Sequence, residues 1–188
     1  MCKANRKLEA FRYILTKFVG RQKELTPASS DVEIFSSFSN KRLMKLLYLL
    51  CLESVPFDDS DEKGLFEIFD NMIAYPNGPV EQDVYDGLEL IPEIKYENGK
   101  LVNLSVEYSG SIEPRYREMV NDAFKKLVQH IDEKIFLETE RLINIVHSLY
   151  LWPKTYVSSS ESKSIDVANK SELIKEKQIY DQIVSQIA

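Results

Sequence analysis

Few side chains in this sequence could carry out catalysis. His130 and His147 are its only histidines, and Cys2 and Cys51 are its only cysteines. An enzymatic site needs such a group with a base, an acid or a metal beside it. Two histidines and two cysteines cannot build a three-histidine centre, a four-cysteine zinc site or a disulfide framework. We therefore predict no catalytic residues, no metal and no cofactor, and a protein that is not an enzyme.

Cys51 and His147 could pair as a nucleophile and its base. Cys51, however, lies in the most apolar stretch of the chain, where burial raises the pKa of a thiol and makes it unreactive. For His147 two roles stay open: a structural histidine near a helix end, or a member of a site. The six glycines form neither a Gly-x-Gly-x-x-Gly motif nor a phosphate loop, which argues against a nucleotide-dependent enzyme.

Lys45 stands out because it is a charge within an apolar stretch that runs to Leu52. A buried ammonium needs a partner or a route to solvent, since an unpaired buried charge is costly. We predict that a carboxylate after the next sharp turn, Glu81 or Asp83, pairs with Lys45.

The segment from Leu65 to Leu88 contains that turn. Its apolar residues recur at helical spacing up to Ile73, and Tyr75-Pro76 is expected to end this helix. Gly78 then acts as a joint, and Pro79 suits the first position of a second helix.

The remaining elements follow from periodicity and turn residues. We expect helices over 8–19, 41–52, 114–131, 139–152 and 171–188, and a hairpin of strands 91–96 and 101–108 around Asn98-Gly99. Residues 21–39 are predicted to form a loop. The fold class is therefore mainly α, a compact bundle of about five to six helices with one small inserted β-hairpin. Residues 1–157 form one helical domain, 158–170 a polar linker, and 171–188 an amphipathic helix that docks or exchanges between subunits.

Three segments together carry a resemblance. They are Leu43-Met44-Lys45-Leu46-Leu47-Tyr48, then Ala74-Tyr75-x-x-Gly78-Pro79-Val80-x-x-x-Val84-Tyr85, then Leu142 to His147 followed by Trp152-Pro153. In order and spacing they resemble the Panacea domain family, which includes SocA-like antitoxins and phage-associated GepA-like proteins. The resemblance covers roughly residues 8 to 155.

The resemblance implies an antitoxin-like protein that binds a cognate toxin, usually the product of a neighbouring gene, and blocks it or presents it to a protease. The partner-binding or family-motif residues that it implies are Lys45, Tyr48, Tyr75, Gly78, Pro79, Val80, Tyr85, His147 and Trp152. The aromatic residues of this set converge if the helices pack as the family implies, either in the core or as interface anchors. The alternative is a phage- or mobile-element-associated hydrolase that uses His147 with a carboxylate.

Charge and hydropathy limit the partners further. The net charge of −6 argues against nonspecific binding of nucleic acid, which depends on clustered Lys and Arg. The longest apolar run, around Leu46 to Leu52, is too short to span a bilayer, and the first residues contain no signal-peptide core. We expect a cytoplasmic protein without a membrane partner, and a homo-oligomer is compatible with the sequence.

Overall fold

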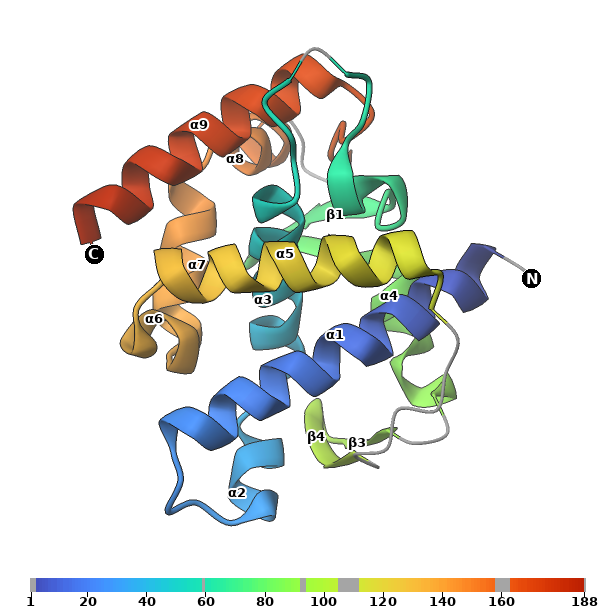
Figure 1. Cartoon of the computed structure of the whole chain (residues 1–188), viewed down its shortest axis with the longest axis vertical. Helices are drawn as coiled ribbons and strands as arrows, with labels where there is room; N and C mark the ends of the chain where they lie inside the picture. The colour runs from blue at the N-terminus through green and yellow to red at the C-terminus, as the bar shows by residue number, and fades with distance from the viewer. Residues whose placement is uncertain (1–2, 59, 92–93, 105–111, 158–162, 188) are drawn as a thin grey trace.

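The structure is a computed structural model that describes residues 3–58, 60–91, 94–104, 112–157 and 163–187 (Figure 1). Its described residues hold nine α-helices: α1 (Lys3–Leu25), α2 (Asp31–Ser36), α3 (Asn40–Glu53), α4 (Gln82–Gly87), α5 (Pro114–His130), α6 (Glu133–Leu137), α7 (Thr139–Ser148), α8 (Leu151–Val157) and α9 (Lys170–Ile187). The mainly helical class is confirmed. The predicted number of helices was too low, because α2, α6 and α8 are too short to show a clear period in the sequence, whereas α4 lies within the helix predicted after Gly78.

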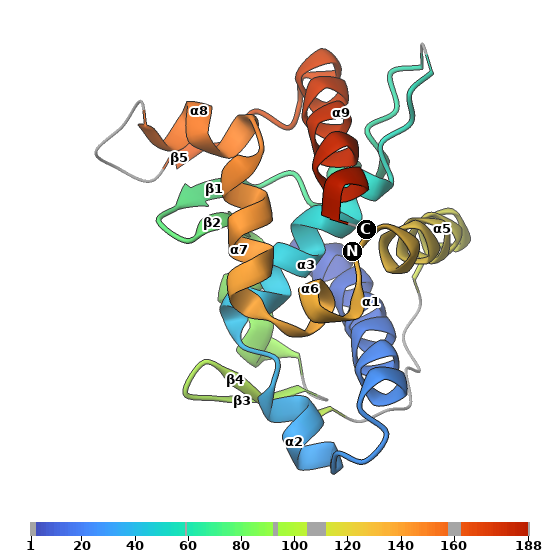
Figure 2. The ribbon, with the colours of Figure 1, turned by 90° about the vertical axis from the view of Figure 1, so that its left-hand side faces the viewer.

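Helix α3 is the centre of the molecule. Every residue from Arg42 to Glu53 is buried, as expected for a helix that is apolar nearly all round. It contacts α5, α7 and α9, and Figure 2 shows α5 and α7 on opposite sides of it. Ser39 caps its first turn by accepting a hydrogen bond from the backbone N–H of Arg42.

The region predicted as a loop after Gly20 is largely helical. Helix α1 continues through Gly20 to Leu25, because an exposed glycine weakens a helix without ending it. Helix α2 then begins at a capping box in which Ser30 and Glu33 exchange hydrogen bonds. It buries Ile34 and Phe35 against the core.

The predicted β-hairpin is present as β3 (Ile94–Glu97) and β4 (Lys100–Leu104). Asn98 and Gly99 both have positive φ, 52° and 72°, which is the conformation of a type I′ turn. Residues 105–108, which were predicted to extend the second strand, lie outside the described residues.

A second sheet, which was not predicted from the sequence, replaces the predicted helix before Tyr75. Its strands are β1 (Met72–Tyr75), β2 (Gly78–Glu81) and β5 (Lys163–Ser164), antiparallel in the order β2-β1-β5. The stretch before it forms only a short 3-10 turn, Gly64–Glu67. Short apolar runs fit both periods, and here pairing with β2, which follows after the two loop residues Pro76-Asn77, decides in favour of β-structure.

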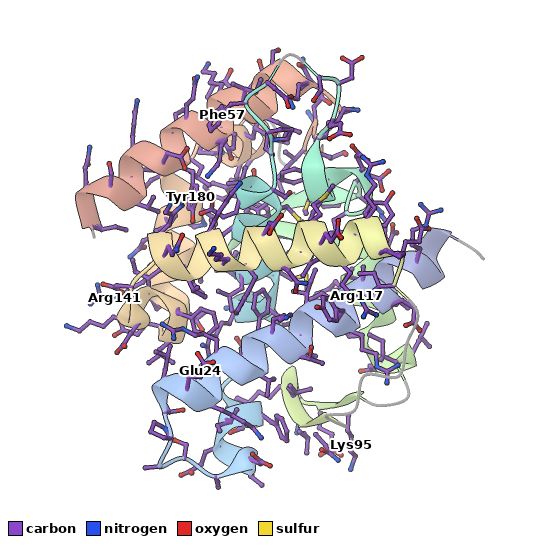
Figure 3. The ribbon with its side chains drawn as sticks, in the orientation of Figure 1. Glu24, Phe57, Lys95, Arg117, Arg141 and Tyr180 are labelled. Carbon is purple, nitrogen blue, oxygen red and sulfur yellow. The ribbon has the colours of Figure 1, made fainter. Side chains whose placement is uncertain are left out.

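The predicted linker and C-terminal helix lie against the rest of the molecule. Residues 158–162 are outside the described part, but Lys163–Ser164 pairs with β1, and Ile165 and Val167 are buried. Helix α9 contacts α3 and α5 and buries three apolar side chains, Leu173, Tyr180 and Val184. Figure 3 shows Tyr180 between α9 and α5.

Proline does not end the helix that begins at Thr139. Helix α7 ends at Ser148, and Pro153 lies in the first turn of α8. The first four N–H groups of a helix have no partner within it, so a proline there costs no hydrogen bond.

Candidate functional site

The Gly-Pro-Val segment is a β-strand and not the start of a helix. Tyr75 pairs with Gly78 across the two-residue loop Pro76-Asn77, and Pro79 and Val80 pair with Ala74 and Ile73. Helix α4 begins only at Gln82, where the side chain of Glu81 caps it by accepting from the N–H of Val84 at 2.8 Å.

Gly78 is required at this corner for two reasons. Its φ of 104° is a conformation that residues with a side chain rarely adopt. A Cβ at this position would also lie 2.7 Å from Cγ2 of Val146 and 2.9 Å from Cε of Lys45. The hairpin backbone therefore packs directly onto α3 and α7.

Lys45 lies beneath this hairpin, and the predicted ion pair with Glu81 or Asp83 is wrong. Its Nζ donates a 2.7 Å hydrogen bond to the backbone carbonyl of Pro79, and its side chain is 1% exposed. Among the described residues no carboxylate forms an ion pair with it. Burial, and to a lesser extent the neighbouring Lys41, lower the pKa of Lys45 to about 7.

The two predicted partner carboxylates bind a different lysine. Nζ of Lys7 lies 2.6 Å from Glu81 and 2.9 Å from Asp70, and it also contacts Asp83. Burial acts to lower the pKa of Lys7, but the hydrogen bonds to the three carboxylates outweigh it and raise that pKa. Lys7 thus joins α1 to β2 and α4, which leaves Lys45 without an acidic neighbour from this group.

A pocket of about 180 Å³ opens between the start of α3, the β1–β2 hairpin and α4. The side chains that form most of its wall are Met44, Lys45, Tyr75, Pro76, Val80 and Tyr85, with Asn40 and Lys41 also lining it. The hydroxyl of Tyr75 is fixed by donating to Gln82 at 2.8 Å, whereas Tyr85 is 43% exposed. Four of the nine motif residues therefore meet at one aromatic pocket.

His147 and Trp152 lie behind the same hairpin. Their rings stack with centroids 3.9 Å apart, Tyr156 stacks on the other face of Trp152, and the indole N–H donates to the carbonyl of Tyr75 at 2.8 Å. Nε2 of His147 is buried and has no hydrogen-bond partner among the described residues. Burial, and then the charge of Lys45, lower the pKa of His147. These contacts make His147 a packing residue and do not place a carboxylate on it.

Tyr48 does not join the other aromatic residues of the motif set. It is fully buried, and its hydroxyl donates to Oε1 of Glu176 on α9 at 2.7 Å. The other oxygen of Glu176 accepts from the backbone N–H groups of Tyr150 and Leu151, at 2.7 and 2.8 Å. Tyr48 therefore holds α9 on α3, and the expected convergence of all four aromatic side chains is wrong.

The histidine that has an acidic partner is His130, for which no role was predicted from the sequence. Its Nδ1 lies 2.8 Å from the fully buried carboxylate of Glu53, and the side chain itself is 41% exposed. The second oxygen of Glu53 accepts from Lys177, which also binds Asp181. His130 and Asp181 border a cavity of about 280 Å³. Residues 77 and 124 positions apart meet here, so no local sequence signal could have found the cluster.

Among the residues that the structure describes, two groups of acidic and histidine side chains are close enough together to hold a metal ion. They are Glu53, His130 and Asp181, and Asp70, Glu81 and Asp83, each with ligand atoms within 4.8 Å of one another. In both groups a lysine ammonium, Lys177 or Lys7, already lies against two or more of the carboxylates. The protein supplies its own cation at these places.

The fold and pocket define a mainly helical protein with an aromatic, lysine-containing pocket beside a β-hairpin. Comparisons with protein families, curated proteins and solved structures find no match. The resemblance to the Panacea domain family therefore stays a prediction. Within the described residues, no helix combines the length and hydropathy needed to cross a membrane.

Proposed function

We propose that this protein is a protein-binding module of the antitoxin kind, without enzymatic activity, that neutralises a cognate toxin by direct contact. The observation that carries the proposal is the aromatic pocket between α3, the β1–β2 hairpin and α4. Small concave pockets with tyrosine in the wall are typical places for the anchor side chain of a protein partner. Two of the three segments that resemble the Panacea family line this pocket.

Two mechanisms of neutralisation are compatible with this proposal. In the first, occupation of the toxin surface is sufficient. In the second, the complex is delivered to a protease, and the toxin is degraded only when this protein is present. Measuring the lifetime of the toxin in cells with and without this protein distinguishes them, since simple sequestration leaves that lifetime unchanged or longer.

The test is co-expression with the product of the adjacent gene. We expect that gene to stop growth when expressed alone, and this protein to restore growth and to purify in complex with its product. A harmless neighbour that forms no complex would contradict the proposal.

A pair of variants then tests whether the toxin contacts the pocket. Tyr85→Ala removes an exposed ring from the pocket, and we expect the affinity for the toxin to fall at least about tenfold. Phe57→Ala is the matched control, because Phe57 is 54% exposed on the loop after α3 and does not line the pocket (Figure 3). Equal losses in the two variants, or no loss in Tyr85→Ala, would exclude the pocket as the contact.

The hydrolase alternative now rests on His130 and not on His147. A buried carboxylate that orients a half-exposed histidine beside a cavity is an arrangement that general bases use. His130→Gln would abolish a hydrolytic activity and leave toxin binding intact. Under the antitoxin proposal, this variant keeps full neutralisation.

A further inference from the structure

Lys45 gives the pocket a specific electrostatic character. Its ammonium is almost completely buried, and its hydrogen bond to the carbonyl of Pro79 uses one of three N–H groups. A buried cation that lacks a carboxylate is unfavourable and is stabilised by any anion that reaches it. Lys41 adds a second positive charge at the pocket, although the whole chain carries a net charge of −6.

The rest of the pocket limits the shape of such an anion. Besides the two lysines and two asparagines, Asn40 and Asn77, the lining side chains are apolar or aromatic. The volume of about 180 Å³ equals the space of roughly six water molecules, enough for one side chain.

We infer that the pocket binds a glutamate side chain of the partner protein, with its carboxylate on Lys45 and its methylene groups against Tyr75 and Tyr85. This inference rests on the proposed function and names the chemistry of the partner. Glutamate fits better than aspartate, because Lys45 is only 1% exposed and a longer side chain reaches a buried ammonium more easily. A C-terminal carboxylate would have to bring main chain into a space of this size.

The surroundings of Lys45 make this binding dependent on pH. The titratable groups near it are Lys41 on α3, His147 on α7 and the two tyrosines in the wall, while Glu81 on β2 is bound to Lys7. The pKa of about 7 means that Lys45 loses its charge as the pH rises above 7. Affinity for a carboxylate then falls by up to about tenfold per pH unit, and affinity for a neutral analogue does not change.

The experiment uses small mimics and needs no toxin. The full chain, with its lysine ε-carbons labelled with carbon-13, is titrated by NMR with N-acetylglutamate N-methylamide and with the neutral N-acetylglutamine N-methylamide. At pH 6 we expect the acid to bind at least tenfold more tightly than the amide. Binding of the acid should also shift the NMR signal of Lys45 and raise the pKa of Lys45. The difference should shrink between pH 7 and 9. Lys45→Met should bind both compounds equally, and Lys126→Met, an exposed lysine on α5, should behave as the parent.

Several results would overturn the inference. They are no binding of the acid, equal binding of acid and amide to the parent chain, and retention of the preference for the acid in Lys45→Met. Free N-acetylleucine offers a terminal carboxylate. If it bound more tightly than the glutamate compound, the group recognised by the pocket would be a C-terminal carboxylate and not a glutamate side chain. A toxin complex that forms while the acid does not bind would reject this inference alone. Binding of the acid without any toxin complex would reject the proposed function alone.

Discussion

Lys45 and Arg42 lie one turn apart on α3 and bury a positive charge in different ways. Arg42 donates to the carbonyl of Phe136 at 3.1 and 2.7 Å and to Gln22 at 2.7 Å, and its guanidinium lies 4.5 Å from the ring centroid of Phe38. Its donors are thus matched by acceptors from α1 and α6. Among the described residues, the ammonium of Lys45 has a single hydrogen-bond acceptor, the backbone carbonyl of Pro79. This contrast makes Arg42 a structural residue and leaves Lys45 available for a ligand.

The burial of Lys45 predicts a pH-dependent stability. Its pKa of about 7 in the folded protein lies below the 10.5 of an unperturbed lysine, so the unfolded chain binds more protons between these values. Its contribution to the free energy of unfolding therefore rises with pH in that window, by about 1.4 kcal/mol per unit.

Lys45→Met removes this dependence. At pH 6 we expect the variant to be more stable than the parent by roughly 1–3 kcal/mol, and the gap to close between pH 7 and 9. Urea unfolding at a series of pH values measures both. A gap that stays constant over this range would show that Lys45 keeps its charge throughout.

Gly78 and Gly99 form a matched pair of turn glycines with positive φ. Gly78→Ala combines backbone strain with collisions against Val146 and Lys45, so we expect a loss of about 3 kcal/mol or more. Apart from the two chain neighbours of Gly99, no atom of the described residues lies within 4 Å of a Cβ placed on it, so Gly99→Ala should cost only about 1 kcal/mol. Thermal unfolding gives the two values, and equal losses would contradict the close packing of the β1–β2 hairpin on α3.

Among the elements, α9 is attached through a buried carboxylate. Burial raises the pKa of Glu176, and the hydrogen bonds from Tyr48 and from the backbone of Leu151 and Tyr150 oppose that rise. Since the folded pKa is the higher one, the contribution of Glu176 to stability is present at low pH and decreases as the pH rises through the folded pKa.

Two substitutions separate the charge of Glu176 from its hydrogen bonds. Glu176→Gln keeps an oxygen for the two N–H groups and loses the charge. At pH 7 its free energy of unfolding should therefore be equal to that of the parent or up to about 1 kcal/mol higher, and any gain should shrink toward pH 4.5. Glu176→Leu leaves these buried donors without an acceptor and should lose about 3 kcal/mol. Urea unfolding of both variants is the measurement, and equal stabilities would mean that the hydrogen bonds contribute nothing.

Local signals predicted some elements well and others badly. Asn98-Gly99 and the stripe of α5 specify their structures within a few residues, and both elements were found at their predicted places. Strand β1 was missed because its four residues fit two periods and its partner strands decide the outcome. The prediction that Gly20 ends the first helix was wrong, since α1 continues past it to Leu25 and buries Gln22 on the way.

The candidate site was predictable only in part, for a related reason. Lys45, Tyr75, Val80 and Tyr85 were named from the sequence and do line one pocket. The partner of Lys45 was wrong because a backbone carbonyl, that of Pro79, leaves no trace in residue type. The Glu53–His130 contact and the role of Arg42 depend on helices far apart in sequence, which spacing cannot reveal.

At the scale of the whole molecule, the C-terminal helix completes the core. Removing residues 170–188 would expose the partners of Leu173, Tyr180 and Val184 and leave Tyr48 and Glu53 without their contacts to α9. We expect the shortened chain to lose cooperative unfolding, as followed by near-UV circular dichroism. Deleting only residues 186–188, where Gln186 and Ile187 are exposed, should change the midpoint little. A cooperative transition in the shorter chain would show that 1–169 folds alone.

The central position of α3 also bears on how the protein is made. Helix α3 ends at Glu53, yet it contacts α9, which ends at Ile187. At translation rates of about 5–20 residues per second, an α3 already synthesised waits on the order of ten seconds for its last covering helix. During that time its apolar surface is open to chaperones, to proteases and to other nascent chains. The supply of this protein in the cell should therefore depend on folding assistance as well as on synthesis.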